Sequence, residues 1–330
     1  MTHRYPDFYK EFVCIANRCP DSCCKDWDVV VDSESEAFYN TVKGKLGEKL
    51  RAVTVTDEDG DRIFTLQNER CPFWNCDELC DIYIELGEEH LCRTCKSFPR
   101  ITADYTAFAE HHLSLACPEA ARLILSADNT YAEFDKIPDP LICEDYGAEL
   151  MARLIDLRRV SADIFRDRSR PFSDRIEAAM MLNVFSADDA EALEPSVSAR
   201  RIFDFFETLD FMSEENKRVL LCGRKAFGKR PIPLELDLYF ERLALYLLYR
   251  YFLNAIDSGD TLDCILRIAC AYIIIGSALA ADLTLDPIVL MQKYSKEIEH
   301  SYENNEELEF AFAENPYFSA HSLIQIIKVN

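Results

Sequence analysis

Ten cysteines between Cys14 and Cys117 are the residues most able to do chemistry in this chain of 330 residues, which has 14 cysteines in all. They form four groups: Cys14-x4-Cys19-x3-Cys23-Cys24, Cys71-x4-Cys76-x3-Cys80, Cys92-x2-Cys95 and a single Cys117. Thiolates bind soft and borderline metal ions, and closely spaced cysteines let one loop present two ligands to one ion. The pattern therefore predicts a cysteine-ligated metal centre in the first 120 or so residues.

The spacing of the cysteines favours iron–sulfur over zinc without excluding zinc. Four thiolates complete either a tetrahedral zinc site or a 4Fe-4S cluster, so ten cysteines could supply one or two such centres. Zinc ribbons use two C-x2-C pairs, and here only Cys92 and Cys95 have that spacing. The radical-enzyme arrangement C-x3-C-x2-C is absent, because Asp26 and Tyr83 stand where its third cysteine would be.

The compartment supports metal chemistry over disulfides. The N-terminal residues contain no apolar stretch of a secretory signal, so we expect a cytoplasmic protein. Dense cysteines in a reducing compartment indicate metal or redox chemistry. The later cysteines, which are scattered on helical or linker segments, are expected only to pack: Cys143, Cys222, Cys264 and Cys270.

The charge and the apolar segments exclude two classes of partner. With 59 acidic and 36 basic side chains, the net charge of -23 repels phosphate backbones and anionic lipids, so we expect no nucleic-acid partner. The most apolar segment, Cys264 to Leu283, is about as long as a membrane span but contains Arg267. We interpret it as a buried helix and expect no membrane span.

The predicted fold is mainly α. A cysteine-rich metal-binding domain, residues 1–128, contains a small β-hairpin around Glu58 to Asp61. Residues 129–143 read as a linker, and residues 144–330 read as an all-helical domain, a bundle of five to seven helices.

Local signals place three helices in the first domain. Asp32 or Ser33 is a candidate N-cap for a helix from about Glu34 to Arg51. A short helical piece is expected near Asp81 to Gly87. Pro118 is suited to open a helix that runs through Ile124.

Three strings of this sequence resemble the flagellin lysine-N-methylase family. They are FVCIANRCPDSCCKDWDVVVD, CPFWNCDELCDIYIELGEEHLCRTCKSFPR and LSLACPEAARLIL. The chain resembles more loosely the CxxCxxCC group of zinc- or iron-chelating proteins. It departs from the family pattern at Asp26, where the family tends to have glycine, and at Trp74, where it tends to have leucine. Cys76 looks additional, so it ranks after the other cysteines as a ligand.

The resemblance implies transfer of a methyl group from S-adenosylmethionine to a lysine ε-amine of flagellin or another protein substrate, by a protein with a cysteine-bound metal centre. The predicted metal ligands are Cys14, Cys19, Cys23, Cys24, Cys71, Cys80, Cys92, Cys95 and Cys117. The alternative is a non-enzymatic iron–sulfur or zinc protein that handles metal or senses redox state. A further alternative is a protein in which zinc is purely structural.

Lysine methylation by a polar route needs a neutral amine in line with the sulfonium methyl, and a group that removes the ammonium proton. Tyr83 and Tyr105 are candidate catalytic residues, with the alternative that they are core or rim aromatics. Arg100 and Trp27 are candidate cofactor-binding residues, and Arg100 could instead form a salt bridge. No G-x-G motif occurs, so the cofactor site would differ from the usual dinucleotide-type turn.

Overall fold

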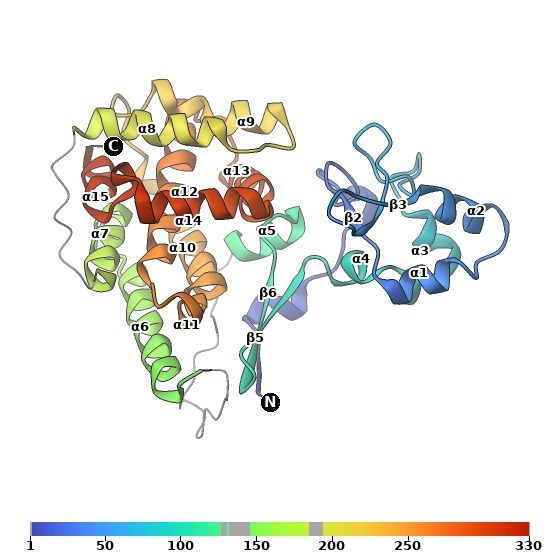
Figure 1. Cartoon of the computed structure of the whole chain (residues 1–330). Coiled ribbons are helices and arrows are strands. Elements are labelled where there is room, and N and C mark those ends of the chain that lie inside the picture. The colour runs from blue at the N-terminus through green and yellow to red at the C-terminus, as the bar shows by residue number, and fades with distance from the viewer. Residues whose placement is uncertain (1, 127–130, 132–145, 185–193, 330) are drawn as a thin grey trace.

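The computed structural model describes residues 2–126, 131, 146–184 and 194–329, and most of them are helical. Figure 1 shows a large helical lobe and a smaller cysteine-rich lobe, with strands β5 and β6 between them. The predicted mainly α class is confirmed. The expected number of helices is wrong, because the described part of the chain after residue 145 contains ten α-helices, α6 to α15.

The small lobe is built from short elements around a three-stranded antiparallel sheet of order β2-β4-β3. Its elements are β2 (Val29–Val30), α1 (Ser33–Tyr39), α2 (Gly44–Val53), β3 (Thr54–Thr56), β4 (Arg62–Phe64), α3 (Asp81–Leu86) and α4 (Arg93–Ser97). β3 and β4 form the predicted hairpin. α3 confirms the predicted helical piece. It ends at Gly87, which has a φ of 94° that glycine adopts readily.

The predicted helix from Glu34 to Arg51 is two helices in the structure. Asp32 caps the first, because its carboxylate accepts a hydrogen bond from the Ser35 amide at 3.0 Å. The helical conformation is then interrupted between α1 and α2, and α2 begins at Gly44, which has a φ of 77°. Residues with positive φ cannot continue a right-handed helix, so the single helix was a wrong prediction.

A second sheet joins the lobes. It has the order β1-β6-β5, from β1 (Thr2–Arg4), β5 (Arg100–Asp104) and β6 (Phe108–Leu113), with β1 parallel to β6 and β5 antiparallel to it. Helix α5 (Pro118–Ser126) follows and begins at Pro118 as predicted. The sheet packs on the helical lobe, since Phe108 and Leu113 of β6 belong to the same core as the helices.

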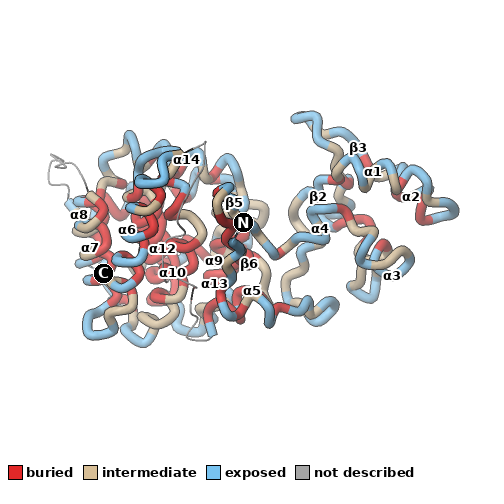
Figure 2. Tube along the Cα trace, turned by 90° about the horizontal axis from the view of Figure 1, so that it is seen from below, coloured by how far each residue is buried: buried red, intermediate tan, exposed pale blue. Residues whose placement is uncertain are grey.

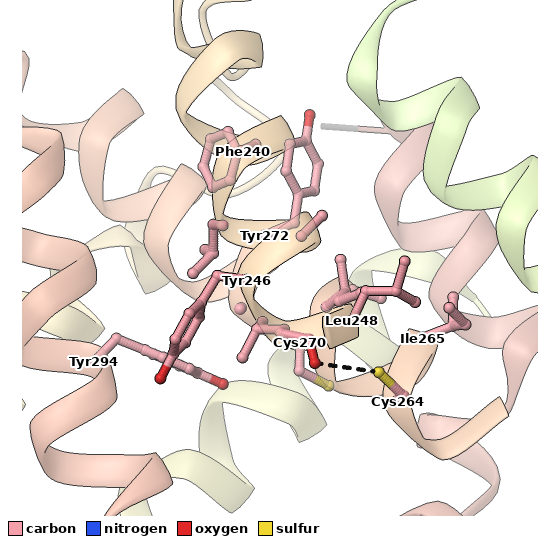
Figure 3. Packing of buried hydrophobic residues seen from close by; sticks show 14 of the residues in the cluster. Phe240, Tyr246, Leu248, Cys264, Ile265, Cys270, Tyr272 and Tyr294 are labelled. Carbon is pink, nitrogen blue, oxygen red and sulfur yellow. Dashed lines mark hydrogen bonds between the residues drawn. The ribbon is translucent and has the colours of Figure 1, made fainter. Parts of the chain in front are cut away.

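The helices of the helical lobe pack around α12 (Leu262–Ala281), which is buried along nearly its whole length (Figure 2). Its other α-helices are α6 (Ala148–Arg166), α7 (Phe172–Asn183), α8 (Pro195–Thr208), α9 (Glu214–Leu220), α10 (Asp237–Tyr251), α11 (Ala255–Ser258), α13 (Pro287–Tyr294), α14 (Tyr302–Glu314) and α15 (Ala320–Val329). A π-helical turn, Ser295–Glu299, directly follows α13. Figure 3 shows α10 and α12 packed together through aromatic and aliphatic side chains, including Phe240 and Tyr272.

Helix α12 is the one described helix that is long and apolar enough to cross a membrane, but 94% of its apolar window is buried inside the structure. That is the environment of a core helix. Cys264 and Cys270 lie on it and are buried, as predicted, and the Cys264 thiol donates to the Leu247 carbonyl at 3.6 Å (Figure 3). The prediction is wrong for Cys222, which is exposed, and Cys143 lies outside the described residues.

The described residues form two hydrophobic cores, and residues 2–126 contribute to both. The small core contains Val29, Leu50, Phe64 and Phe73, whereas residues of the second sheet and of α5 join the large helical core. The predicted linker, residues 129–143, lies outside the described residues except for Tyr131, which stacks on Tyr249. The predicted division into domains 1–128 and 144–330 therefore stays a prediction.

Candidate functional site

Five of the predicted ligands share one neighbourhood in the small lobe: Cys24, Cys71, Cys80, Cys92 and Cys95. Burial raises the pKa of the Cys71 thiol to about 12, and the charges of Cys24, Cys80 and Cys92 add to the increase. Within this group Cys92 and Cys95 are hydrogen-bonded, and this bond lowers the pKa of Cys92 and raises that of Cys95. The turn from Cys92 into α4 thus presents two thiols together, as the C-x2-C spacing predicts.

Four other predicted ligands share a second neighbourhood near α5: Cys14, Cys19, Cys23 and Cys117. Burial raises the pKa of Cys117 to about 11, and the charges of Cys19 and Cys14 add to it. The charges of Cys117 and Cys14 also raise the pKa of Cys23. The adjacent Cys23 and Cys24 link the two neighbourhoods, because the hydrogen bond between them raises the pKa of Cys23 and lowers that of Cys24 to about 7.

Thiols are suitable ligands for a soft metal ion, but the structure does not arrange these thiols in a coordination shell. Within the described ranges, no three or more Cys, His, Asp or Glu side chains are arranged as a metal-ion site. All the described cysteines are free thiols. The predicted convergence on an inorganic centre is therefore not confirmed, and the ligand set, including the exposed Cys76, stays a prediction.

The other candidates from the sequence lie in different places. Tyr83 is 51% exposed on α3, and Tyr105 is 8% exposed between β5 and β6. Arg100 is exposed, with its guanidinium 5.1 Å from the Phe12 ring centroid. Trp27 is the candidate that contacts both lobes: its indole N–H donates to the Cys23 carbonyl at 2.9 Å, and its ring lies 5.4 Å from the ring of His300.

Residues 292–300, which we call the junction segment, bring the cysteine loops onto the helical lobe. Lys296 in the π-helical turn is only 1% exposed. Its ammonium donates to Asp21 at 2.9 and 3.1 Å and to Asp26 at 3.0 Å, and it lies 5.4 Å from the Trp27 ring centroid. Two carboxylates from the loop that carries Cys19, Cys23 and Cys24 therefore share one buried lysine, and these three groups form the Lys296 cluster.

Two more side chains of the junction segment contact cysteine segments. Gln292 donates to Asp21 at 3.0 Å and to the Ala116 carbonyl, next to Cys117, at 2.7 Å. His300 lies 2.6 Å from the Ser114 hydroxyl, and its ring also packs against Phe98, which follows the Cys92–Cys95 turn. Protein packed around this imidazole lowers its pKa to about 4, so His300 is neutral near pH 7.

Glu299 completes the junction segment on the side of α10. Its Oε2 accepts hydrogen bonds from the hydroxyls of Tyr246 at 3.1 Å and Tyr251 at 2.9 Å. Tyr246 in turn accepts from the Leu115 amide at 3.2 Å, between Ser114 and Cys117. Burial raises the pKa of the Glu299 carboxyl, and hydrogen bonds from Ser295 and Tyr251 and the charge of Arg250 oppose that rise.

Sequence reasoning missed Lys296, Glu299 and His300. They lie in the charged run SKEIEH, which is typical of a solvated helix face. Their partners are 48 or more residues away, and Asp21 is 275 residues from Lys296. No local signal marks such contacts. A π-helical turn often occurs at functional sites, but its backbone is visible only in the structure.

Comparisons with known proteins identify the class. The sequence of the FliB lysine N-methylase C-terminal domain matches residues 200–326, which include the whole junction segment. The lysine-N-methylase of Salmonella choleraesuis is 32% identical over 148 residues, which cover 41% of this chain and 35% of that relative. The flagellar biosynthetic protein FliU of Salmonella muenchen is 31% identical over 148 residues, 41% of this chain and 84% of that relative. The lysine-N-methylase of Salmonella typhimurium is 31% identical, again over 41% of this chain and 35% of the relative.

Fold and site thus define a class of mainly helical proteins whose C-terminal half contacts a thiol-rich lobe. The chain belongs to the FliB lysine-N-methylase family. The matched part spans about a third of the length of the two lysine-N-methylases. No solved structure matches the chain.

Proposed function

We propose that this chain transfers a methyl group from S-adenosylmethionine to a lysine ε-amine of flagellin or another protein, in the cytoplasm. Membership of the lysine-N-methylase family supports this function. The observation that carries it is the junction segment. Gln292, Lys296 and His300 lie in the matched family domain, and together they contact three cysteine segments. A domain common to methylases therefore organises the thiol-rich part of this chain.

The reaction sets clear demands on the site. The lone pair of a neutral lysine amine attacks the methyl carbon, the carbon–sulfur bond breaks, and its electron pair stays on sulfur as a thioether. Because a free lysine has a pKa of about 10.4, its ammonium must first lose a proton to a nearby base or to water. Alignment of amine, carbon and sulfur supplies much of the rate enhancement. Neutral groups such as His300 are suited to line such a site, since they add no charge that would repel the ammonium.

We also propose that the cysteines bind a metal centre, one or two 4Fe-4S clusters or alternatively zinc. The two thiol neighbourhoods and the hydrogen-bonded pairs Cys23–Cys24 and Cys92–Cys95 support this proposal. Such a centre would cross-link loops that are otherwise held by short elements. Because metal ligation needs thiolates, binding would release protons from thiols such as Cys71, whose pKa in the free protein is about 12.

The test is methyl transfer by the pure chain prepared without oxygen. It is incubated with flagellin and S-adenosylmethionine labelled in the methyl group, and lysine methylation is read by mass spectrometry. Label on flagellin lysines is the expected result. The absence of label under both reducing and oxidising conditions would refute the flagellin assignment.

The metal proposal is tested separately by metal analysis and visible absorbance of the same sample. Broad visible absorbance with bound iron supports a cluster, and stoichiometric zinc without such absorbance supports the alternative. Cys80→Ser should lower the metal content, whereas the matched Cys222→Ser, an exposed cysteine outside the cysteine groups, should not. Metal without methyl transfer or binding of the methyl donor would favour the non-enzymatic alternative.

A further inference from the structure

A pocket opens on the helical lobe where α6 ends and where α7 and α10 begin. Its volume of about 400 Å³ falls within the range of ~300–1,000 Å³ that is usual for small-molecule sites. It is separate from the junction segment. The pocket includes Asp237, the first residue of α10, whereas Tyr251, which contacts Glu299, ends that helix ~21 Å away.

Two arginines share one carboxylate in this pocket. Glu241, whose side chain is 4% exposed, accepts hydrogen bonds from Arg168 at 2.8, 3.0 and 3.1 Å and from Arg175 at 2.9 Å. One carboxylate cannot neutralise two guanidinium groups, so this set carries a surplus positive charge.

Arg175 keeps one donor for the pocket. Its Nε and Nη1 donate to the main-chain carbonyls of Arg170 and Phe165. Its Nη2 has no hydrogen-bond partner among the described residues, and protein does not enclose this atom. An acceptor that enters the pocket, such as a carboxylate, can therefore reach Nη2.

Asp237 contributes a carboxylate with one free oxygen. Its Oδ2 accepts a hydrogen bond from the Phe172 amide at 3.0 Å, and its Oδ1 has no partner in the part of the chain that the structure describes. Burial raises the pKa of this carboxyl, and the charge of Arg175 opposes that rise, so the two charges lie near each other. No salt bridge joins them within the described ranges, and the pocket lies between a free donor and a free acceptor.

The uncharged part of the lining is apolar. Leu234 is 67% exposed and Leu238 is half-buried, and both line the pocket. Covering an exposed leucine with an apolar group stabilises the complex, because apolar surface is removed from water. The pocket thus combines a donor for an anion, an acceptor for a cation and an apolar surface.

We propose that this pocket binds a free α-amino acid with an apolar side chain. The α-carboxylate accepts from Arg175 Nη2, the α-ammonium donates to Asp237 Oδ1, and the side chain packs on Leu234 and Leu238. A simple anion would leave Asp237 without a partner and would lie near Glu235, and a simple amine would face the surplus positive charge. A zwitterion matches both sides. This site goes beyond the proposed function, because it needs neither the methyl donor nor a metal.

Calorimetry with the full chain tests the two ends of the ligand separately. The probes are L-leucine, N-acetyl-L-leucine, which has no ammonium group, and L-leucinamide, which has no carboxylate. Each analogue should bind roughly tenfold more weakly than L-leucine, because each loses one hydrogen bond between charged groups. Glycine should also bind more weakly, because it has no side chain to cover the leucines.

Asp237→Asn tests the acceptor. It should weaken L-leucine roughly tenfold and leave the Kd of N-acetyl-L-leucine unchanged, since that analogue has no ammonium to lose. Asparagine can still accept from the Phe172 amide, so α7 keeps its contact. Asp286→Asn is the matched control, because Asp286 also accepts a main-chain N–H at the start of a helix, α13, but does not line the pocket. It should change neither Kd.

The results can also overturn the site. Failure of the wild type to bind L-leucine at millimolar concentration would do so, as would a wild-type Kd for L-leucine in Asp237→Asn. An equal loss of L-leucine and N-acetyl-L-leucine in that variant would show a merely structural role for Asp237. Binding of L-leucinamide as tightly as L-leucine would exclude recognition of the carboxylate by Arg175. None of these measurements depends on methyl transfer.

Discussion

The Lys296 cluster yields the strongest test of how the two lobes are held together. In Lys296→Met the side chain keeps roughly its length but loses the ammonium that pairs with both Asp21 and Asp26. The two carboxylates, 23% and 6% exposed as side chains, then face each other without their shared partner. We therefore expect the cysteine loop to detach from the junction segment before the helical lobe unfolds.

The size of the effect follows from the burial of the three groups. Removing one partner of a buried ion pair costs about 3–5 kcal/mol. Asp21 is partly exposed, and Asp26 keeps Lys25 at 3.5 Å, so the lower end of that range applies. We expect Lys296→Met to lower the free energy of unfolding by about 3 kcal/mol. The exposed pair of Lys328 and Glu177 provides the control, because Lys328→Met should cost at most about 1 kcal/mol.

Tryptophan fluorescence can follow this loop alone. The chain has two tryptophans, so a Trp74→Phe background leaves Trp27, which lies beside Lys296, as the only reporter. Urea unfolding is measured in this background for Lys296→Met and Lys328→Met. Equal midpoints for the two lysine variants would refute the reasoning. The triple change of Lys296→Met with Asp21→Asn and Asp26→Asn should recover most of the stability, because a neutral set leaves no unpaired buried charge.

Three further predictions concern other parts of the structure. Burial lowers the pKa of His112 to about 3, well below the usual value of about 6.5. Between these two values the unfolded state binds more protons than the folded state, so the free energy of unfolding falls as the pH drops from about 6 to 4. His112→Leu should show a shallower fall in denaturant midpoints over that range, and an unchanged slope would contradict a neutral His112. Arg158→Met should lower the free energy of unfolding by about 3 kcal/mol, because it breaks the buried ion pair with Glu110. Adding Glu110→Gln should restore part of that stability. If the double variant is no more stable, the unpaired Glu110 carboxylate does not cause the loss. Removing the metal of the proposed centre with a chelator should expose the small lobe to limited proteolysis while the helical lobe stays intact. Cleavage spread over both lobes would contradict independent cores.

Elements with strong local signals could be predicted from the sequence. The turn around Gly60, with a φ of 92°, supports the hairpin of β3 and β4, and Pro118 opens α5. The single helix predicted from Glu34 was wrong because the N-cap signal at Asp32 marks only where a helix begins, and it says nothing of the interruption before Gly44. The parallel pairing of β1 with β6 joins residues more than 100 positions apart, and no local pattern could indicate it.

The candidate site was only half predictable for the same physical reason. Residue type and spacing revealed the cysteines, because metal chemistry favours particular donors at short intervals. Lys296, Glu299 and His300 gain their roles from tertiary contacts, and Lys296 is buried although a charged run in the sequence predicts an exposed segment.

The π-helical turn from Ser295 to Glu299 places a constraint on the length of the chain. Lys296, Glu299 and His300 reach three different partners from five consecutive positions, namely Asp21, Tyr251 and Ser114. Deleting one residue within the turn would rotate every later side chain by about 100° about the helix axis, and these contacts would be lost together. Homologous proteins that keep this arrangement should therefore vary in residue type along this segment but not gain or lose a single position.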